Sequence, residues 1–374
     1  MGIGRQFFRM RVAAGLTQDA VAEQMCITRQ TLSNWERDIT LPDIFSIARL
    51  AALYSVPLDD YFLKGWIYRK EKMMKTQYNT RQIHMLIHKH YPDAADIQAL
   101  SGGLVSQTYV FKSQEKFCIF QLGGKEEDYQ KERYVSRLYA DILPVRRVRE
   151  LYRTPNGNAC CFSDYIEGRK LFDTDPAALA GMVPEILSVL EKIAAAPVPA
   201  RAGYGRFDAS GHAPFACWPD FIASVCDRSR YDWGAFMDGC CEAVEAALQI
   251  LERNLSCIDE VSPHLVHGDI GSYNLLAEGG HISGIIDWNY ALFGDPLFEL
   301  ANIIFWNEDK LYPLVRTLQE KYSPQRGLYR RLHLYALRIG LEEAYNTAVL
   351  GQIGYDEDWV IQRIGQLVGI FKSI

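Results

Sequence analysis

The chain has 374 residues, of which 48% are hydrophobic and 23% are charged, and its formal net charge is -6. This length predicts two or three compact domains, and this composition excludes a largely disordered chain. Met1–Arg11 lacks an apolar signal core and no apolar run is long enough to cross a membrane, so a secreted or membrane protein is not expected. The nine cysteines include two adjacent pairs and no C-x-x-C spacing, which favours reduced thiols in the cytoplasm over disulfides or a zinc cluster.

Charge is distributed unevenly along the chain. Residues 1–66 carry 7 basic and 7 acidic side chains, residues 67–90 have a net charge of +5, and residues 91–374 have a net charge of -11. The acidic part is a reasonable receptor for a polycationic ligand, although acidity that serves solubility alone remains an alternative. The basic stretch predicts a partly helical linker over 67–92, with a phosphate-contacting role as the alternative.

The first 66 residues predict a succession of short helices. Thr17 is placed to cap a helix over 18–25, and Thr28 is placed to cap a second helix over 29–37. Further helical stretches are expected to begin at Pro42 and at Pro57. Two short helices joined by a tight turn and braced by others predict a small all-α helix-turn-helix domain.

Several motifs in this segment carry a family resemblance. Gly15-Leu16-Thr17-Gln18 and the run from Thr31 to Arg37 resemble the Cro/repressor-type helix-turn-helix family. The resemblance implies that residues 1–66 bind DNA, with the second helix in the major groove and a homodimer on a two-fold site. The implied DNA contacts are Gln18, Arg29, Gln30, Ser33 and Asn34. A helical docking or dimerisation module without DNA is the alternative.

The periodicity changes after residue 100. Residues 108–112 and 117–122 predict two strands, and the stretch 101–107 ahead of them is a turn with two glycines. Glycines let backbone N–H groups approach a phosphate closely, but two glycines between strands are more often a plain turn. The G-x-x-x-x-G-K-[ST] motif does not occur, so a P-loop enzyme is not expected.

The most specific motif lies between residues 267 and 287. His267-Gly268-Asp269 is followed by Asn274, and a predicted strand over 282–286 leads to Asp287. Phosphoryl transfer needs one carboxylate to orient or deprotonate the attacking hydroxyl, and oxygen ligands that hold Mg²⁺ on the nucleotide phosphates. The spacing H-x-D-x-x-x-x-N is that of protein-kinase catalytic loops. The alternative is that the aspartates order turns and that the histidine is a buried structural residue.

These motifs, together with Gly294-Asp295-Pro296, resemble the aminoglycoside phosphotransferase-like kinases, and the hygromycin branch more than the family at large. The similarity covers residues 95–370. It implies an α+β, bilobal protein-kinase-like fold behind the small all-α domain. The domains expected are 1–66 for DNA binding, 67–92 as linker, 93–168 as the first lobe with the hinge, and 169–374 as the second lobe with substrate-capping helices.

The resemblance also implies Mg²⁺ and ATP, with GTP as an alternative, and roles for individual residues. Asp269 is the implied catalytic base with His267 as its support, and Asn274 and Asp287 are the implied magnesium ligands. The implied nucleotide-binding residues are Gly102, Gly103, Ser106, Gln121, Glu132, Phe162, Asp164 and Ile166. Carboxylates and aromatic rings suit a polyammonium acceptor, and the substrate candidates are Tyr290, Asp295, Glu308, Asp309 and Trp233.

One position departs from the family pattern. The third strand of these kinases usually offers Lys or Arg to the phosphates, but Gln121 stands there, and Lys116 and Lys125 are off register. The expected function is an ATP-dependent O-phosphotransferase of a hygromycin B-like aminocyclitol antibiotic that confers resistance, fused to a DNA-binding domain. The alternatives are a ligand-sensing transcriptional regulator with a kinase-like body and a kinase of another small hydroxylated metabolite. The acceptor hydroxyl, the operator and the oligomeric state stay open.

Overall fold

The computed structural model of the chain describes residues 7–8, 10–11, 14–36, 40, 42–54, 78–100, 106–233, 242–258, 260–325, 327–348 and 357–374. The chain divides into two compact units, one with residues 1–74, 232–241 and 343–360, the other with residues 75–231, 242–342 and 361–374. None of the described helices combines the length and the apolar character that crossing a bilayer requires. The described cysteines are all free thiols.

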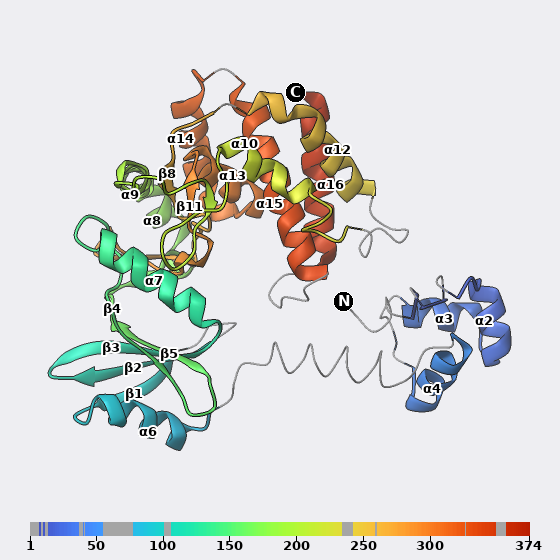
Figure 1. Cartoon of the computed structure of the whole chain (residues 1–374), viewed down its shortest axis with the longest axis horizontal. Coiled ribbons are helices and arrows are strands. Elements are labelled where there is room, and N and C mark those ends of the chain that lie inside the picture. The colour runs from blue at the N-terminus through green and yellow to red at the C-terminus, as the bar shows by residue number, and fades with distance from the viewer. Residues whose placement is uncertain are drawn as a thin grey trace. The chain divides into compact units, whose positions relative to one another are not determined.

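The N-terminal unit contains the predicted pair of short helices. Helix α2 (Gln18–Met25) is capped by Thr17, whose hydroxyl accepts from the Ala20 backbone N–H at 3.2 Å. The predicted turn ends α2 at Cys26, which adopts the left-handed conformation with φ of 56°. Helix α3 (Arg29–Glu36) and helix α4 (Ile44–Leu53) follow (Figure 1). The helix predicted at Pro57 lies outside the described residues.

A buried carboxylate links the ends of this small helical domain. Glu36 accepts from Arg11 Nε at 2.6 Å and from Gln18 Nε2 at 2.7 Å. The core beneath is apolar and consists of Phe7, Met10, Val21, Met25, Leu32, Trp35, Leu50 and Tyr54. A buried carboxylate needs such partners, because burial without them would disfavour its charge. Glu36 therefore fixes Gln18, the first residue of α2, against the last turn of α3.

The second unit begins with a lobe built on a sheet, residues 78–164, which we call the sheet lobe. Five strands pair in the order β1-β2-β3-β5-β4, all antiparallel. The elements are α6 (Thr80–His90), β1 (Ala95–Leu100), β2 (Ser106–Ser113), β3 (Lys116–Gly123), α7 (Glu126–Tyr139), β4 (Val148–Arg153) and β5 (Ala159–Asp164). The strands predicted over 108–112 and 117–122 are confirmed as the central parts of β2 and β3.

The two helices of the sheet lobe cover opposite faces of the sheet (Figure 1). On one face, Ile83 and Ile87 of α6 are fully buried against Phe120 and Phe162. On the other face, Tyr129 of α7 packs with residues of β5. Alternate residues of a strand point to opposite faces. Consecutive residues of β5 are buried under both helices, so both faces of the sheet are apolar near its centre. Helix α6 lies in the stretch that the sequence suggested as a linker, but its apolar side is part of this core.

The elements after residue 168 form a mainly helical lobe, which we call the helical lobe; parts of its last two helices, residues 343–348 and 357–360, belong to the first unit. It contains two three-stranded sheets, with the orders β10-β9-β6 and β7-β11-β8. The strands are β6 (Arg169–Lys170), β7 (Gly205–Arg206), β8 (His264–Val266), β9 (Leu275–Glu278), β10 (His281–Ile285) and β11 (Leu292–Gly294). The α-helices are α8 (Pro176–Gly181), α9 (Val183–Ala195), α10 (Trp218–Ala223), α12 (Glu242–Asn254), α13 (Leu297–Trp306), α14 (Tyr312–Tyr322), α15 (Leu328–Ala348) and α16 (Glu357–Ser373). Short 3-10 turns complete it at 171–173, 224–226, 255–257, 288–290 and 309–311.

The loop between α7 and β4 is hydrogen-bonded to the end of β10. The Ile285 backbone N–H donates to Pro144 O at 2.8 Å, and Val145 forms a parallel bridge with Ile285. Strand β10 ends there and leads into Asp287. The sheet lobe is thus joined to the strand that carries the predicted metal ligand.

Candidate active site

The 267–274 loop connects β8 to β9, and its conformation depends on a glycine. Gly268 has φ of +79°, and a Cβ at that position would lie 2.5 Å from Tyr290 O. Both the backbone angle and the close approach exclude a side chain there. The glycine therefore lets the loop pass directly beneath the segment that follows Asp287.

The buried carboxylate of Glu299 holds this loop from below. Gly268 N donates to Oε2 at 3.0 Å, and Ile270 N donates to Oε1 at 2.9 Å. Glu299 lies in the first turn of α13 and is only 5% exposed. Burial raises its pKa, and the backbone N–H donors partly offset that effect. The two bonds fix the backbone on both sides of Asp269.

His267 is fully buried and supports the loop from the other side. Its Nδ1 accepts from the Asp269 backbone N–H at 3.2 Å, so Nε2 carries the proton and donates to Ile286 O at 3.0 Å. The ring also lies edge-on to Trp288, with 4.6 Å between ring centroids. Burial lowers the pKa of His267 to about 4, so the ring is neutral at physiological pH. The side chain links Asp269 to the segment before Asp287.

Asn274 orients the carboxylate of Asp269. Its Nδ2 donates to Asp269 Oδ2 at 2.9 Å and to Asp269 O at 2.8 Å. Both amide hydrogens are used, so the direction of the amide oxygen is also fixed. The Ile286 backbone N–H donates to Asn274 O at 3.0 Å, which places Asp287 one residue from this pairing. Asp269, Asn274 and Asp287 therefore lie on adjoining, hydrogen-bonded segments.

Asp287 has an unusual backbone and a perturbed carboxyl. Its φ and ψ are both 66°, in the left-handed region, where aspartate is tolerated better than most side chains. Asp287 keeps an exposed surface area, but many protein atoms lie around its carboxyl group. The resulting desolvation raises the pKa of that carboxyl to about 6. The negative charge of Glu132 raises it further, and Arg146 opposes the shift. Added positive charge here would favour the ionised carboxylate.

The donor set at this point fits a hard divalent cation. The amide oxygen of Asn274 and the carboxylate of Asp287 are oxygen ligands, which Mg²⁺ prefers. Mg²⁺ typically takes one or two protein oxygens and keeps water or phosphate for the rest. The residues present therefore fit the predicted metal.

A buried ion pair lies on the α7 face of the sheet lobe. Arg146 NH2 donates to both carboxylate oxygens of Glu132, each at 2.6 Å. Glu132 is 6% exposed, and the charge of its carboxylate is balanced by this arginine. Gln121 in β3 makes no such contact, and its Oε1 is buried without a hydrogen-bond partner among the described residues. Glu132 stands at the position predicted for an ion pair, and its partner is Arg146 from the loop between α7 and β4, which the sequence did not suggest.

Lys131 of α7 connects the two lobes next to the site. Its buried Nζ donates to Asn289 O at 2.8 Å and to Ala291 O at 2.7 Å. Burial, and then the nearby Arg206, lower its pKa to about 7. The carbonyls belong to the segment that follows Asp287. Helix α7 is thereby anchored to that segment.

The predicted nucleotide residues fall into separate groups. Phe162 is 1% exposed and packs in the core under α6, so its side chain serves the core, and its predicted place in the adenine hinge stays a prediction. Asp164 bonds Arg149 at 2.6 Å, and the side chain of Ile166 packs over Gly284. Ser106 begins β2 opposite Gly123. Gly102 and Gly103 lie outside the described residues.

Two of the predicted acceptor contacts have structural roles instead. Asp295 is buried, accepts from Leu297 N at 2.9 Å and Tyr335 Oη at 2.9 Å, and so orders the start of α13. Trp233 is 1% exposed, with its ring 5.5 Å from that of Tyr345. Neither side chain is available to an acceptor, because each is enclosed by its own packing.

The other three acceptor candidates lie near the loop. Glu308 accepts from Ser272 N at 3.3 Å and from the Ser272 hydroxyl, so it braces the loop. The ring of Tyr290 lies under the guanidinium of Arg206, 4.2 Å from its carbon. Asp309 is exposed. Their predicted contact with an acceptor stays a prediction.

The predicted DNA contacts lie mostly on the outer side of α3. Arg29 and Gln30 are exposed, and Ser33 and Asn34 are half-buried. Gln30 Nε2 donates to Asn34 Oδ1 at 2.9 Å. Gln18 bonds Glu36 and accepts from Arg29 Nε at 3.4 Å, so it holds that arginine from behind. The four residues of α3 predicted to contact bases therefore share one side of the helix.

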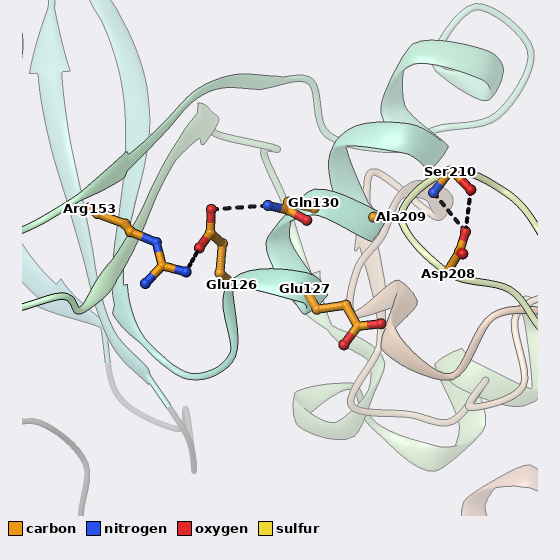
Figure 2. Close-up of a pocket in the computed structure, with 7 residues that line it drawn as sticks. All are labelled: Glu126, Glu127, Gln130, Arg153, Asp208, Ala209 and Ser210. Atoms are coloured by element: carbon orange, nitrogen blue, oxygen red, sulfur yellow. Dashed lines mark hydrogen bonds and ion pairs between the residues drawn. The ribbon is translucent and has the colours of Figure 1, made fainter.

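Figure 2 shows a separate open pocket beside the first turns of α7. Its volume is about 480 Å³, and it is lined by Glu126, Glu127, Gln130, Arg153, Asp208, Ala209 and Ser210. Glu126 pairs with Arg153 and accepts from Gln130, and Asp208 accepts from Ser210 Oγ at 2.6 Å. Because neither Asp269 nor Asn274 nor Asp287 lines this pocket, we assign it no part in the chemistry.

Sequence reasoning missed three functional side chains of this site. Glu299 had one available signal, a carboxylate inside the otherwise apolar run from Leu297 to Trp306. No local signal in the sequence pointed to Lys131 or Arg146, because their contacts are to carbonyls and carboxylates that are distant in the sequence. Local spacing predicted the loop but not what holds it.

Two family models match the chain. The model described as "Phosphotransferase enzyme family" matches residues 96–335, and a model described as "Helix-turn-helix" matches residues 8–61. The chain is 29% identical to Hygromycin-B 4-O-kinase of Escherichia coli over 304 residues, which cover 79% of this chain and 87% of that protein. It is also 35% identical over 72 residues to the HTH-type transcriptional regulator ImmR of Bacillus subtilis (strain 168), covering 19% of this chain and 57% of that protein.

Solved structures share the fold of the second unit. A thermostable mutant of aminoglycoside phosphotransferase APH(4)-Ia, in a ternary complex with AMP-PNP and hygromycin B, matches with a TM-score of 0.71 and 30% identity. The match covers 77% of this chain and 98% of that chain. The α+β kinase-like architecture and the preceding helix-turn-helix domain agree with the sequence prediction.

The neutral buried state of His267 predicts a specific loss of stability in acid. The folded pKa of about 4 lies below the ordinary 6.5, so the free energy of unfolding should fall as the pH drops from about 6.5 to about 4. His267→Gln keeps a donor toward Ile286 and removes the titration. The difference in unfolding free energy between wild type and variant should change by roughly 3 kcal/mol across that window.

Urea unfolding at several pH values measures this difference, with His281→Gln as the control because His281 is exposed at the start of β10. The control should follow the wild type at every pH. A His267→Gln protein with the same pH dependence as the wild type would contradict a neutral, buried His267.

Proposed function

The chain belongs to the phosphotransferase enzyme family, and from this membership we propose that it transfers the γ-phosphoryl group of ATP to a hydroxyl of a hygromycin B-like aminocyclitol. The observation that carries the proposal is the Asp269–Asn274 pairing on a loop braced by Glu299, with Asp287 alongside. This arrangement supplies the base and the oxygen ligands that phosphoryl transfer to a hydroxyl requires. Modification of such an antibiotic would confer resistance to it.

Each residue of the site has a defined task in the proposed reaction. Asp269 orients the acceptor hydroxyl and takes its proton as the new O–P bond forms and the bond to the leaving phosphate breaks. Asn274 fixes the orientation of that carboxylate, because its Nδ2 donates to Asp269 Oδ2 at 2.9 Å. Asn274 Oδ1 and Asp287 would hold Mg²⁺, which would supply positive charge to the phosphate oxygens. Glu299 and His267 keep the loop from shifting during the transfer.

Three observations support ATP and an ammonium-rich acceptor. A relative of known structure binds AMP-PNP together with hygromycin B. Residues 91–374 carry a net charge of -11, which suits a polycation. Tyr290, whose carbonyl lies against Gly268, and Asp309, which follows the loop-bound Glu308, offer an aromatic ring and a carboxylate.

We also propose that the helix-turn-helix domain binds DNA through α3. Arg29 and Gln30 lie on its exposed side, and these residue types read guanine and adenine edges in the major groove. Leu32 and Trp35 face the core, so the reading side and the packing side of the helix are separate. The protein would then join a kinase to a DNA-binding domain in one chain.

The kinase proposal predicts a phosphorylated acceptor. The full-length protein with Mg²⁺ and ATP should add one phosphoryl group to hygromycin B or a related aminocyclitol, detected by mass spectrometry across a panel of aminoglycosides. Asp269→Asn should lower kcat about 10²- to 10⁴-fold, because the general base is lost, while nucleotide binding is kept. Asp141→Asn, at an exposed aspartate, is the matched control.

Two results would count against this proposal. The absence of product from every panel member would remove the antibiotic acceptor, although not the kinase fold. An Asp269→Asn protein with wild-type turnover would remove Asp269 as the base.

The DNA proposal predicts a selective loss of binding. Arg29→Ala and Gln30→Ala should each weaken binding to the protein's own upstream DNA by about 1–3 kcal/mol, because each removes a base contact. Fluorescence anisotropy at one fixed salt concentration measures this. Arg49→Ala is the control, since Arg49 lies on α4 and bonds Gln24 O. Equal affinity of all three variants and the wild type would contradict the assignment of α3.

A further inference from the structure

The α7 face of the sheet lobe contains two buried polar atoms that lack partners among the described residues. They are Gln121 Oε1, in β3, and Arg146 Nε, in the loop between α7 and β4. Buried polar groups are nearly always hydrogen-bonded, to protein, water or ligand. Arg146 Nε is a donor that a bound acceptor would complete, whereas Gln121 Oε1 is itself an acceptor and calls for a donor such as water.

Register places the Gln121 side chain on the face of the sheet that α7 covers. Gln121 pairs with Cys161 across β3 and β5, and Cys161 belongs to the cluster under α7. Burial raises the pKa of the Cys161 thiol to about 12, with Glu132 raising it further and Arg146 lowering it. Those two charges are therefore close to the neighbour of Gln121, and the amide and the guanidinium share one side of the sheet.

The guanidinium of Arg146 is only partly used by Glu132. A single nitrogen, NH2, donates to both carboxylate oxygens at 2.6 Å. An arginine has five N–H donors in a rigid fork, so Nε and NH1 remain for another acceptor. The arginine side chain is 13% exposed, so part of it reaches solvent, whereas Nε itself is buried.

Arg146 is also close to the predicted metal ligand. Its pKa would be lowered by burial, but Glu132 outweighs that effect and raises it, and Asp287 adds to the increase. The residues just before it, Pro144 and Val145, are bonded to Ile285, two positions ahead of Asp287. The guanidinium thus bonds the ion-pair carboxylate of α7 and is close enough to Asp287 for that charge to affect it.

We propose that Arg146 supplies the positive charge that binds the nucleotide phosphates, in place of the cation that β3 lacks at Gln121, while it also holds Glu132. The inference rests on the proposed kinase function and names a nucleotide-binding residue for it. A charge-assisted contact to phosphate is stronger than one from a neutral amide. Arg146 on the loop would therefore make the charge-assisted phosphate contact that Gln121 on the strand cannot make.

The competing explanation is an ion pair that only fastens the loop to α7. Such a pair would contribute to stability and leave nucleotide affinity unchanged. The neighbouring residue provides a matched control, because Arg147 pairs with Asp141 at the surface and its side chain is 50% exposed. Both arginines belong to the loop between α7 and β4, but Arg146 pairs with a buried carboxylate and Arg147 with an exposed one.

The test is the Kd of Mg²⁺–AMP-PNP, measured by calorimetry on the full-length protein without any acceptor. Arg146→Gln should weaken binding about 10- to 100-fold, the effect of losing one charge-assisted contact. Arg147→Gln should stay within about twofold of the wild type. The double variant Gln121→Arg with Arg146→Gln should recover most of the affinity, because it returns a cation to the strand.

A purely structural pair would give the opposite pattern. An Arg146→Gln protein that binds the nucleotide as the wild type does, or a folded double variant that binds no better than Arg146→Gln, would overturn the assignment. If Arg146→Gln does not fold, Arg146→Lys decides. Lysine keeps the charge but cannot span Glu132 and a phosphate together, so it should bind several-fold more weakly, and a wild-type Kd would overturn the proposal.

This measurement separates the two proposals. Nucleotide binding that depends on Arg146, without phosphorylation of any aminoglycoside, would remove the acceptor and keep the arginine. A wild-type chain that binds no nucleotide would remove the kinase function and the role of Arg146 together.

Discussion

The buried carboxylate of Glu299 is the constraint on which the geometry of the 267–274 loop depends. It accepts from the backbone on both sides of Asp269, at 3.0 and 2.9 Å. A buried carboxylate without such donors would be costly, so the loop and the carboxylate stabilise each other. His267 adds a third attachment through the Asp269 backbone N–H. With its backbone held at these points, Asp269 has its carboxylate oriented by Asn274.

Helix α7 extends this constraint to the sheet lobe. Lys131 donates to two carbonyls after Asp287, and the next residue, Glu132, is bonded to Arg146. One helix therefore contacts both the segment beside the predicted metal ligand and the cation assigned to the phosphates. A shift of α7 would disturb both at once, since the two contacts leave from consecutive residues. The proposed chemistry depends on this coupling between lobes as well as on the loop.

Local sequence signals predicted much of this architecture, and tertiary contacts account for what they missed. The cap at Thr17 and the helix over 18–25 could be predicted from the sequence, because capping is a local interaction. The loop around Asp269 was readable because its spacing is itself a local motif. Asp295 matched a family motif, yet its bonds to Leu297 N and Tyr335 show a structural role that spacing cannot reveal. Arg146 and its neighbour are alike in sequence, and only the fold separates a buried partner of Glu132 from a surface residue.

The most direct test of this account is the turnover of Glu299→Gln with ATP and hygromycin B. Glutamine keeps the shape but has one acceptor oxygen, so one of the two backbone donors loses its partner. The account predicts that kcat falls about 10- to 100-fold, as expected for one buried charge-assisted bond, while the Kd of Mg²⁺–AMP-PNP changes less than about twofold. Glu278→Gln, at an exposed position in β9, should match the wild type. A folded Glu299→Gln protein with wild-type kcat would contradict the account.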